Sequence, residues 1–443
     1  MSIESGGLKR KFMSYIIPSV AAQWVYTLYT MVDGLFVARG VTEVAMTAVN
    51  IANPFVQLMF AISLMFAVGT CTFVAIAIGE GNIKRGSELF TQNIVFLLVL
   101  SAAIGVGAFA LREPLARFLG AEDEETVAYV VEYLSWIVPF APFYILSYSF
   151  EILIKTDGFP RKATMLVLMG AVCNCILDWL FVIVLKKGVA GAAFATSISQ
   201  GVVIVLYLMH FMSDKGMLHF RRFRLHPGQL ARQARNGLSS GLTELSSSVV
   251  TFAFNRVILA VLSSDALVGY TIVSYVNAIV VMSATGIAQG AQPLIGICCG
   301  QRDAVSCRRL LRYSITAAGI FCTAAFALCF AGANVIVSMF VRPELQALRA
   351  QCTVIFSIFS LSFLVAGYNV VISGFFTSVN RPVPALTISV GRVAVMLVCL
   401  FGLAAVSGSA IWWTPLMSEA ICFAGAATLL ARGIKGRDAE LAR

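Results

Sequence analysis

Residues 44–78 read VAMTAVNIANPFVQLMFAISLMFAVGTCTFVAIAI and contain no Asp, Glu, Lys or Arg. A helix that crosses a lipid bilayer needs about 20 predominantly apolar residues, so this stretch is long enough to span a membrane. Lipid offers no hydrogen-bond partners to an open strand, and the stretch lacks the alternating pattern of a barrel strand. It therefore predicts a transmembrane helix.

The rest of the chain has the same character. Hydrophobic residues make up 59% of the 443 residues, charged residues only 12%, and the mean hydropathy is +0.87. A soluble domain carries roughly 25% charged residues, so a water-soluble protein is excluded. Apolar runs separated by charge clusters predict twelve spans, at 12–38, 44–78, 89–111, 125–153, 164–185, 190–212, 237–262, 267–299, 313–340, 350–376, 385–406 and 411–431. The sequence thus predicts an all-α polytopic membrane protein without a large soluble domain.

The basic residues predict the orientation of these spans. If the N-terminus is inside, most of the 32 Lys and Arg residues fall in segments on the inner side, Lys155 among them. Cytoplasmic loops are enriched in Lys and Arg. We therefore expect a multi-pass protein of the plasma membrane with both termini in the cytoplasm, and we assign the net charge of +10 to this bias rather than to nucleic-acid binding.

The two halves of the chain repeat with a nearly constant offset. Gly69 and Gly79 recur as Gly290 and Gly300 at an offset of 221, and Pro160 recurs at an offset of 222. Six spans return the chain to the same side, so the duplication is parallel, as in many transporters with a substrate site between the repeats. The predicted units are a six-helix N-terminal lobe at 1–212, a basic cytoplasmic linker at 213–236 and a six-helix C-terminal lobe at 237–443.

Acidic residues inside the spans are candidate functional groups, because a charge at the bilayer centre costs about 2.5–3.5 kcal/mol on insertion scales. Asn174 and Asp178 are four residues apart and share one helix face. Asp33 from the first span and Thr196 from the sixth are expected to complete their site. Hard oxygen ligands of this kind suit Na⁺, and two close carboxylates can instead share one proton. A hydrogen-bond network between packed helices is the structural alternative.

The repeat locates this chemistry in one half. Shifted by 222, Asn174 becomes Met396 and Asp178 becomes Leu400, whereas Asp33 becomes Asn255. The scaffold is duplicated but the acids are not, which favours a cation site in the N-terminal half alone. Further embedded polar residues are candidates for the substrate cleft or for coupling, namely Glu151, Glu244, Asn255 and Arg392.

Four stretches carry a family resemblance: IPSVAAQWVYTLYTMVDGLFVARGV (17–41), KTDGFPRKATMLVLMGAVCNCILDWLFVIVLKKGVAGAAFATSISQ (155–200), GLTELSSSVVTFAFNRVIL (241–259) and GIAQGAQPLIGICCGQR (286–302). Together they resemble the MATE (multidrug and toxic compound extrusion) family, in particular its MepA-like multidrug-export branch. The resemblance implies two six-helix lobes around a central cleft. It also implies export of cationic or amphipathic drugs and toxic organic compounds from the cytoplasm by alternating access, in exchange for H⁺ or Na⁺.

The resemblance also implies roles for particular residues. The cation site, and the metal site if the ion is Na⁺, would be Asp33, Asn174, Asp178 and Thr196. Glu244 would be the seventh-helix acid that couples the cation or contacts the drug. Two departures are Ser239 or Ser240 at a position where proline is usual and Lys155 where arginine is usual.

Other functions fit less well. A flippase for lipid-linked oligosaccharide or lipid is the alternative, but it would need basic groups for phosphates, and only Arg256 and Arg392 are embedded. An enzyme is not expected, because the GxSxG motif at 237–241 begins an apolar helix rather than a strand–turn–helix elbow. We expect no cofactor besides the coupling ion, and a monomer that binds small organic compounds in the lipid bilayer. The sequence does not choose between H⁺ and Na⁺.

Overall fold

The structure is a computed structural model that describes residues 7–40 and 43–441, and the regular elements in these ranges are all helical. The N-terminal lobe holds α1 (Leu8–Gly40), α2 (Glu43–Gly79), α3 (Ile83–Ala110), α4 (Arg112–Leu119), α5 (Glu124–Ile137), the 3₁₀ turn η1 (Val138–Phe140), α6 (Ala141–Thr156), α7 (Pro160–Asp178), the π-helical η2 (Trp179–Val184) and α8 (Gly188–Phe211). The C-terminal lobe holds α9 (Pro227–Val261), α10 (Ser264–Gly300), α11 (Ala304–Ala331), α12 (Ala333–Ser338), α13 (Gln346–Ser360), α14 (Phe363–Ser378), α15 (Pro382–Val406), the 3₁₀ turn η3 (Gly408–Trp413) and α16 (Thr414–Leu441).

The predicted fold class is confirmed. Within the described residues, ten helical units are long and apolar enough to cross a membrane, or eleven if the pair α13–α14, bent by 40°, is one span. The long helix α1 is not among them, since its middle carries the polar side chains of Gln23, Thr27, Thr30 and Asp33. Counted with α1, these units correspond to the twelve predicted spans.

Several boundaries differ from the prediction. Helix α9 begins at Pro227, inside the predicted linker, because proline is well suited to the first turn of a helix. The predicted span 313–340 breaks at Gly332, and the predicted span 350–376 bends between α13 and α14. Lys155, expected in a cytoplasmic loop, lies within α6 and is only 1% exposed.

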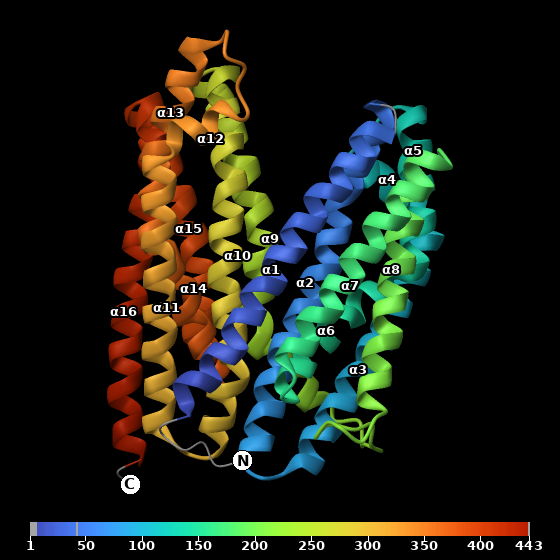
Figure 1. The fold of residues 1–443 in the computed structure, drawn as a ribbon, viewed down its shortest axis with the longest axis vertical. Coiled ribbons are helices and arrows are strands. Elements are labelled where there is room, and N and C mark those ends of the chain that lie inside the picture. The colour runs from blue at the N-terminus through green and yellow to red at the C-terminus, as the bar shows by residue number, and fades with distance from the viewer. Residues whose placement is uncertain (1–6, 41–42, 442–443) are drawn as a thin grey trace.

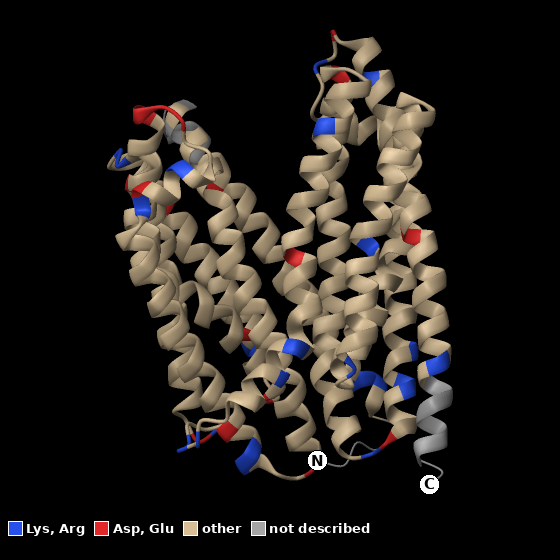
Figure 2. Cartoon of the chain, turned by 180° about the vertical axis from the view of Figure 1, so that it is seen from behind, with Lys and Arg blue, Asp and Glu red and all other residues tan. Residues whose placement is uncertain are grey.

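The two lobes lie side by side near the start of α1 and the end of α16, and they diverge toward the opposite end (Figure 1). Helix α1 crosses between them, since it packs on α10 of the C-terminal lobe and on α7 of its own lobe. Lys and Arg gather mainly at the end where the lobes are close (Figure 2).

Glycines allow the lobes to touch backbone to backbone. A Cβ on Gly79 would lie 3.0 Å from Gly300 Cα, and a Cβ on Gly300 would lie 2.1 Å from Ile76 O. Likewise, a Cβ on Gly237 of α9 would lie 1.8 Å from Met65 O of α2. Gly79 and Gly300 occupy equivalent positions in the repeat, so the two halves meet across their pseudo-symmetry axis at this point.

The segment between α8 and α9 is attached to the N-terminal lobe. The carboxylate of Asp157 accepts the backbone N–H groups of Met217 and Leu218 at 2.6 and 2.8 Å. Ser87 Oγ accepts the N–H of His219 at 3.4 Å, and the side chain of Leu218 is fully buried. The start of the predicted linker therefore packs as part of the lobe.

Candidate functional site

A buried carboxylate cluster lies between α1 and α7. Asn174 and Asp178, one turn apart on α7, are 1% and 0% exposed. The Asp33 carboxyl from α1 lies near enough to that of Asp178 for the two groups to interact electrostatically. The structure thus brings together the three residues that the sequence placed in one site.

The cluster presents oxygen atoms without donors. Both carboxylate oxygens of Asp178, Oδ1 of Asp33 and Oδ1 of Asn174 are buried and accept no hydrogen bond from any described residue. Buried polar atoms in proteins are nearly always paired, so a group of unpaired acceptors calls for a missing partner. A cation or a proton would satisfy these oxygens.

Thr196 has a positioning role in this geometry. Asn174 Nδ2 donates to Thr196 Oγ1 at 3.3 Å, and the same hydroxyl donates to the carbonyl of Ala192 at 3.1 Å. These bonds hold the amide nitrogen of Asn174 toward α8, which leaves its oxygen among the unpaired acceptors. The predicted fourth member of the site therefore supports the ligand set through Asn174.

The helix that carries the cluster changes its winding at this point. α7 continues as the π-helix η2 directly after Asp178, with Leu185 N–H bonded to Leu180 O at 2.8 Å. π-Helical turns in α-helices occur frequently at functional sites. Tyr29, Tyr133 and Tyr144 lie near enough to Asp33 to interact with it electrostatically.

The ligand chemistry fits H⁺ or Na⁺ better than a transition metal. The described residues contain no group of three or more His, Cys, Asp and Glu side chains with metal-binding geometry. Two carboxylates and one amide oxygen are hard donors, the type that Na⁺ shares with other hard cations. In the absence of a cation, two adjacent buried carboxylates cannot both remain charged without a large cost in free energy.

The C-terminal lobe has the same contact without the acids. Ser418 Oγ donates to Met396 Sδ at 3.1 Å, and these residues lie 222 positions after Thr196 and Asn174. The offset found in the sequence therefore holds in three dimensions. Because Leu400 stands at the position of Asp178, the carboxylate cluster has no counterpart in the second lobe.

Glu151, predicted to line the cleft or to take part in coupling, forms a buried ion pair with Lys155. Its Oε1 lies 2.6 Å from Lys155 Nζ, and the two side chains are 0% and 1% exposed. The pair is electrostatic rather than a well-directed hydrogen bond, because neither atom has a hydrogen-bond partner among the described residues. Oε2 of Glu151 accepts from the hydroxyl of Tyr26 on α1 at 3.5 Å.

A hydrogen-bonded chain next to this pair joins the two lobes. Gln289 of α10 donates to the hydroxyl of Tyr148 on α6 at 2.7 Å, and Gln23 of α1 donates to Gln289 at 3.1 Å. Trp24 of α1 also donates to Ser283 of α10 at 2.7 Å. The sequence analysis did not identify the two glutamines, although uncharged amides within long apolar helices could have marked them as contact residues.

Glu244 and Asn255 lie on α9, outside the carboxylate cluster. Both are half-buried, and no described residue gives either of them a hydrogen bond or an ion pair. Glu244 lies near enough to Tyr148 to interact with it electrostatically, and Tyr148 packs edge-on against Phe60 at 4.9 Å between ring centroids. An acid within electrostatic range of an aromatic side chain is a suitable environment for an organic cation.

Arg392 lies in the core of the C-terminal lobe, away from the carboxylate cluster. Its Nη2 lies 2.5 Å from Glu419 Oε1, and Asn369 Nδ2 donates to Glu419 Oε2 at 2.6 Å. The contacts that the structure shows for Arg392 are thus with another helix of its own lobe. The other embedded cation, Arg256, is exposed and lies 5.9 Å from the ring of Phe252.

Comparisons with known proteins agree on one family. The family model MatE matches residues 18–180 and 240–401. The chain is 22% identical over 427 residues to the multidrug export protein MepA of Staphylococcus haemolyticus, covering 95% of this chain and 92% of the relative. It is 20% identical over 422 residues to MepA of Staphylococcus aureus strain NCTC 8325, with the same two coverages.

Solved structures show the same fold. The crystal structure of MATE in the straight conformation matches with a TM-score of 0.92 at 19% identity, over 99% of this chain and 100% of that chain. The outward-facing conformation of a multidrug resistance MATE family transporter matches with a TM-score of 0.91 at 19% identity, over 97% of each chain.

Proposed function

Since this chain belongs to the MATE family of membrane transporters, we propose that it exports cationic or amphipathic organic compounds by antiport against H⁺ or Na⁺. The observation that supports this most is the group of unpaired buried oxygens on Asp33, Asn174 and Asp178. An ion-coupled transporter needs a site whose charge changes during the cycle. This cluster, located in one lobe, has the required chemistry.

The coupling ion would bind between α1 and α7. A proton on the Asp33–Asp178 pair, or Na⁺ held by these carboxylates and Asn174 Oδ1, would neutralise the repulsion between the two carboxylates. A ligand shifts a conformational equilibrium only by its different affinity for the two states. Closer packing of α1 on α7 in the ion-bound state supplies that difference.

Helix α1 can carry this change to the junction of the lobes. Its first half packs on α10, where a Cβ on Gly286 would lie 2.7 Å from Val20 Cα. Pro18 lacks a backbone N–H and marks a point where α1 bends readily, and its carbonyl accepts from Thr164 of α7 at 2.7 Å. Movement of the second half of α1 against α7 would therefore alter the contacts of the first half with the other lobe.

The substrate would bind between the lobes near Glu244. This acid has no polar partner in the described part of the chain, and it lies within electrostatic range of Tyr148, whose ring packs against that of Phe60. A drug cation would supply the missing charge, and the aromatic faces would accommodate different shapes. We propose that this conformation is outward-facing, with the termini in the cytoplasm, since the lobes diverge at the end away from the basic residues (Figures 1 and 2).

Drug transport in proteoliposomes tests the proposal. Purified protein is reconstituted, and a fluorescent organic cation is followed while a pH gradient or a Na⁺ gradient is imposed separately. We expect uphill drug movement with one of the two gradients and none with the variant Asp178→Asn. Antiport would be ruled out if the drug moved downhill at the same rate without either gradient and never moved uphill when a gradient was imposed. Movement of a lipid-linked oligosaccharide across the membrane, in place of drug transport, would favour the flippase.

A further inference from the structure

A second set of polar contacts joins the two lobes, where α2 packs against α9, α10 and α14. Gln292 Nε2 of α10 donates to Val68 O of α2 at 2.7 Å, and Thr72 Oγ1 of α2 donates to Thr377 O of α14 at 3.1 Å. Asn236 Nδ2 of α9 donates to the same carbonyl of Thr377 at 3.1 Å. All of these polar side chains are buried. Since α2 belongs to the N-terminal lobe and α10 and α14 to the C-terminal lobe, the first two bonds hold the lobes together.

Gln233 lies next to these contacts, on the face of α9 that touches α2. Residues 233 and 237 are four apart and share one helix face. A Cβ on Gly69 of α2 would lie 2.0 Å from Gln233 O, and a Cβ on Gly237 would lie 1.8 Å from Met65 O. The side chain of Gln233 is 1% exposed, yet neither its amide nitrogen nor its amide oxygen has a hydrogen-bond partner among the described residues. The amide oxygen of Asn236 is likewise buried and unpaired.

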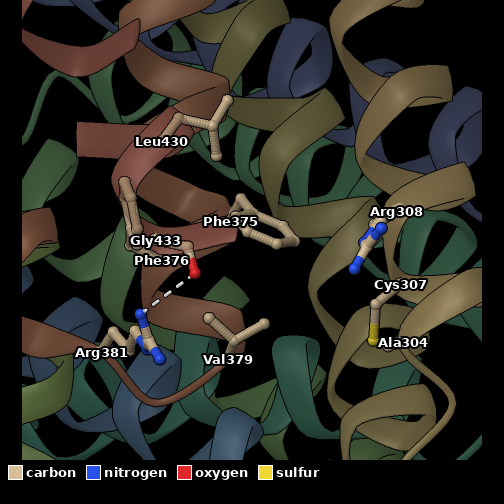
Figure 3. Close-up of a pocket in the computed structure, with 9 residues that line it drawn as sticks. All are labelled: Ala304, Cys307, Arg308, Phe375, Phe376, Val379, Arg381, Leu430 and Gly433. Carbon is tan, nitrogen blue, oxygen red and sulfur yellow. Dashed lines mark hydrogen bonds between the residues drawn. The ribbon is translucent and has the colours of Figure 1, made fainter. Parts of the chain in front are cut away.

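The polar residues of this junction lie at the end of the molecule where the lobes are close. We call them the inner seam: Thr72, Gln233, Asn236, Gln292 and Thr377. Helix α2 ends at Gly79 and α9 begins at Pro227 at this end, where Lys and Arg also gather (Figures 1 and 2). Figure 3 shows a crevice at the same end, between α11 and α16, in which Arg381 Nη1 donates to Gly433 O at 3.5 Å. That bond lies within the C-terminal lobe, whereas the inner seam connects the two lobes.

Unpaired and paired side chains at the junction have opposite effects on its opening. A buried amide without a partner has lost its hydrogen bonds to water and gained none in return, so it raises the free energy of the closed junction. When the lobes separate, water pairs the amide again. Gln289, in contrast, donates to Tyr148 and accepts from Gln23, so separation breaks bonds that stabilise the closed junction. The unpaired atoms of Gln233 and Asn236 therefore bring the closed and open states closer in free energy.

We propose that the inner seam is the gate that opens toward the cytoplasm during transport, and that the unpaired amide of Gln233 keeps this gate ready to open. This inference rests on the alternating access and the outward-facing conformation proposed above. A junction of apolar side chains alone would expose hydrocarbon to water on opening, and a junction with every polar atom paired would lose all of its bonds. The inner seam is held closed by Gln292 and Thr72 but gains hydration at Gln233 when it opens. A small difference in free energy between the two states lets the differential affinity of one ion or one drug molecule drive the change.

The test measures how often the junction opens in the purified full-length protein. Amide hydrogen exchange is followed by mass spectrometry in segments 65–79 of α2 and 227–241 of α9, because exchange there reports local opening. Gln233→Met keeps a side chain of similar length and removes the unpaired groups, so exchange should become on the order of 10-fold slower. Gln289→Met removes paired groups, so exchange should become on the order of 10-fold faster. The control Asn93→Leu also removes a buried, unpaired amide oxygen, but Asn93 bonds to Ser149 within the N-terminal lobe, so exchange at the junction should not change.

Other outcomes would contradict the assignment. Unchanged or faster exchange in Gln233→Met would show that this amide stabilises the closed junction, and an equal change in Asn93→Leu would show an effect on overall stability rather than on the gate. If Gln233→Met does not fold, Gln233→Leu provides the same comparison. Gradient-driven drug efflux, measured in parallel, separates this inference from the proposed function. If efflux occurs but exchange does not respond to the substitutions, the gate is refuted and antiport stands; if exchange responds as expected but the unmodified protein shows no efflux, antiport is refuted and the opening junction stands.

Discussion

Replacing Lys155 by Met should destabilise the protein far more than the same change at an exposed lysine. The substitution keeps a long apolar side chain but leaves Glu151, which is 0% exposed, without its counter-ion 2.6 Å away. Removing one partner of a buried ion pair costs about 3–5 kcal/mol, because the remaining charge is desolvated and uncompensated. Solvent screening of the pair is small, since both side chains are buried. The unfolding equilibrium constant should therefore rise by roughly two to four orders of magnitude.

The free energy of unfolding is measured by reversible SDS titration in mixed micelles, followed by tryptophan fluorescence. The double variant Glu151→Gln/Lys155→Met should be more stable than Lys155→Met alone, because it removes both charges. The control Lys84→Met, at an exposed position on α3, should change stability by no more than about 0.5 kcal/mol. If Lys155→Met is as stable as the control, or if the double variant is no more stable than Lys155→Met, the buried pair does not stabilise the lobe as argued.

Three further predictions concern transport. Asp33→Asn and Asp178→Asn should each abolish gradient-driven efflux while thermal stability is retained or raised, since each removes charge but little volume; full drug resistance in cells that express either variant would contradict the proposed site. Glu244→Gln should weaken export of cationic compounds more than that of neutral ones of similar size, as measured by paired efflux assays; equal loss for both would indicate a folding or coupling role. Gly300→Val should separate the lobes and reduce transport, because even a Cβ would lie 2.1 Å from a backbone oxygen of α2, whereas Gly425→Ala, with nothing within 4 Å of its Cβ, should transport normally.

The carboxylate cluster was largely predictable. Asn174 and Asp178 share a helix face by their spacing alone, and the absence of acids at Met396 and Leu400 located the site in one half. The role of Thr196 was not predictable, because a ligand hydroxyl and a hydroxyl that holds a neighbouring amide look the same in a sequence. Only the hydrogen bond from Asn174 at 3.3 Å distinguishes them.

The partners of the other embedded charges were decided by the tertiary structure. Glu151 and Lys155 are four residues apart, yet the basic pattern assigned Lys155 to a loop, since charge counting cannot tell a snorkelling lysine from a buried one. Arg392 was predicted to lie in the cleft or to take part in coupling, and the sequence did not identify its partner Glu419, 27 residues later on the neighbouring helix. A charge that looks isolated along the chain can be neutralised by a residue on an adjacent helix.

The amino-acid sequence is enough to predict the spans, the duplicated scaffold and the asymmetry of its acids, because the length of an apolar run and the spacing along a helix are local properties. Which helix faces meet depends on the tertiary structure: α1 packs against both lobes, and Gly79 packs against Gly300. The physical reason is that helices in lipid are apolar on most of their surface. The hydrophobic pattern therefore carries little information on lateral packing, which depends on small residues and on polar contacts between distant parts of the chain.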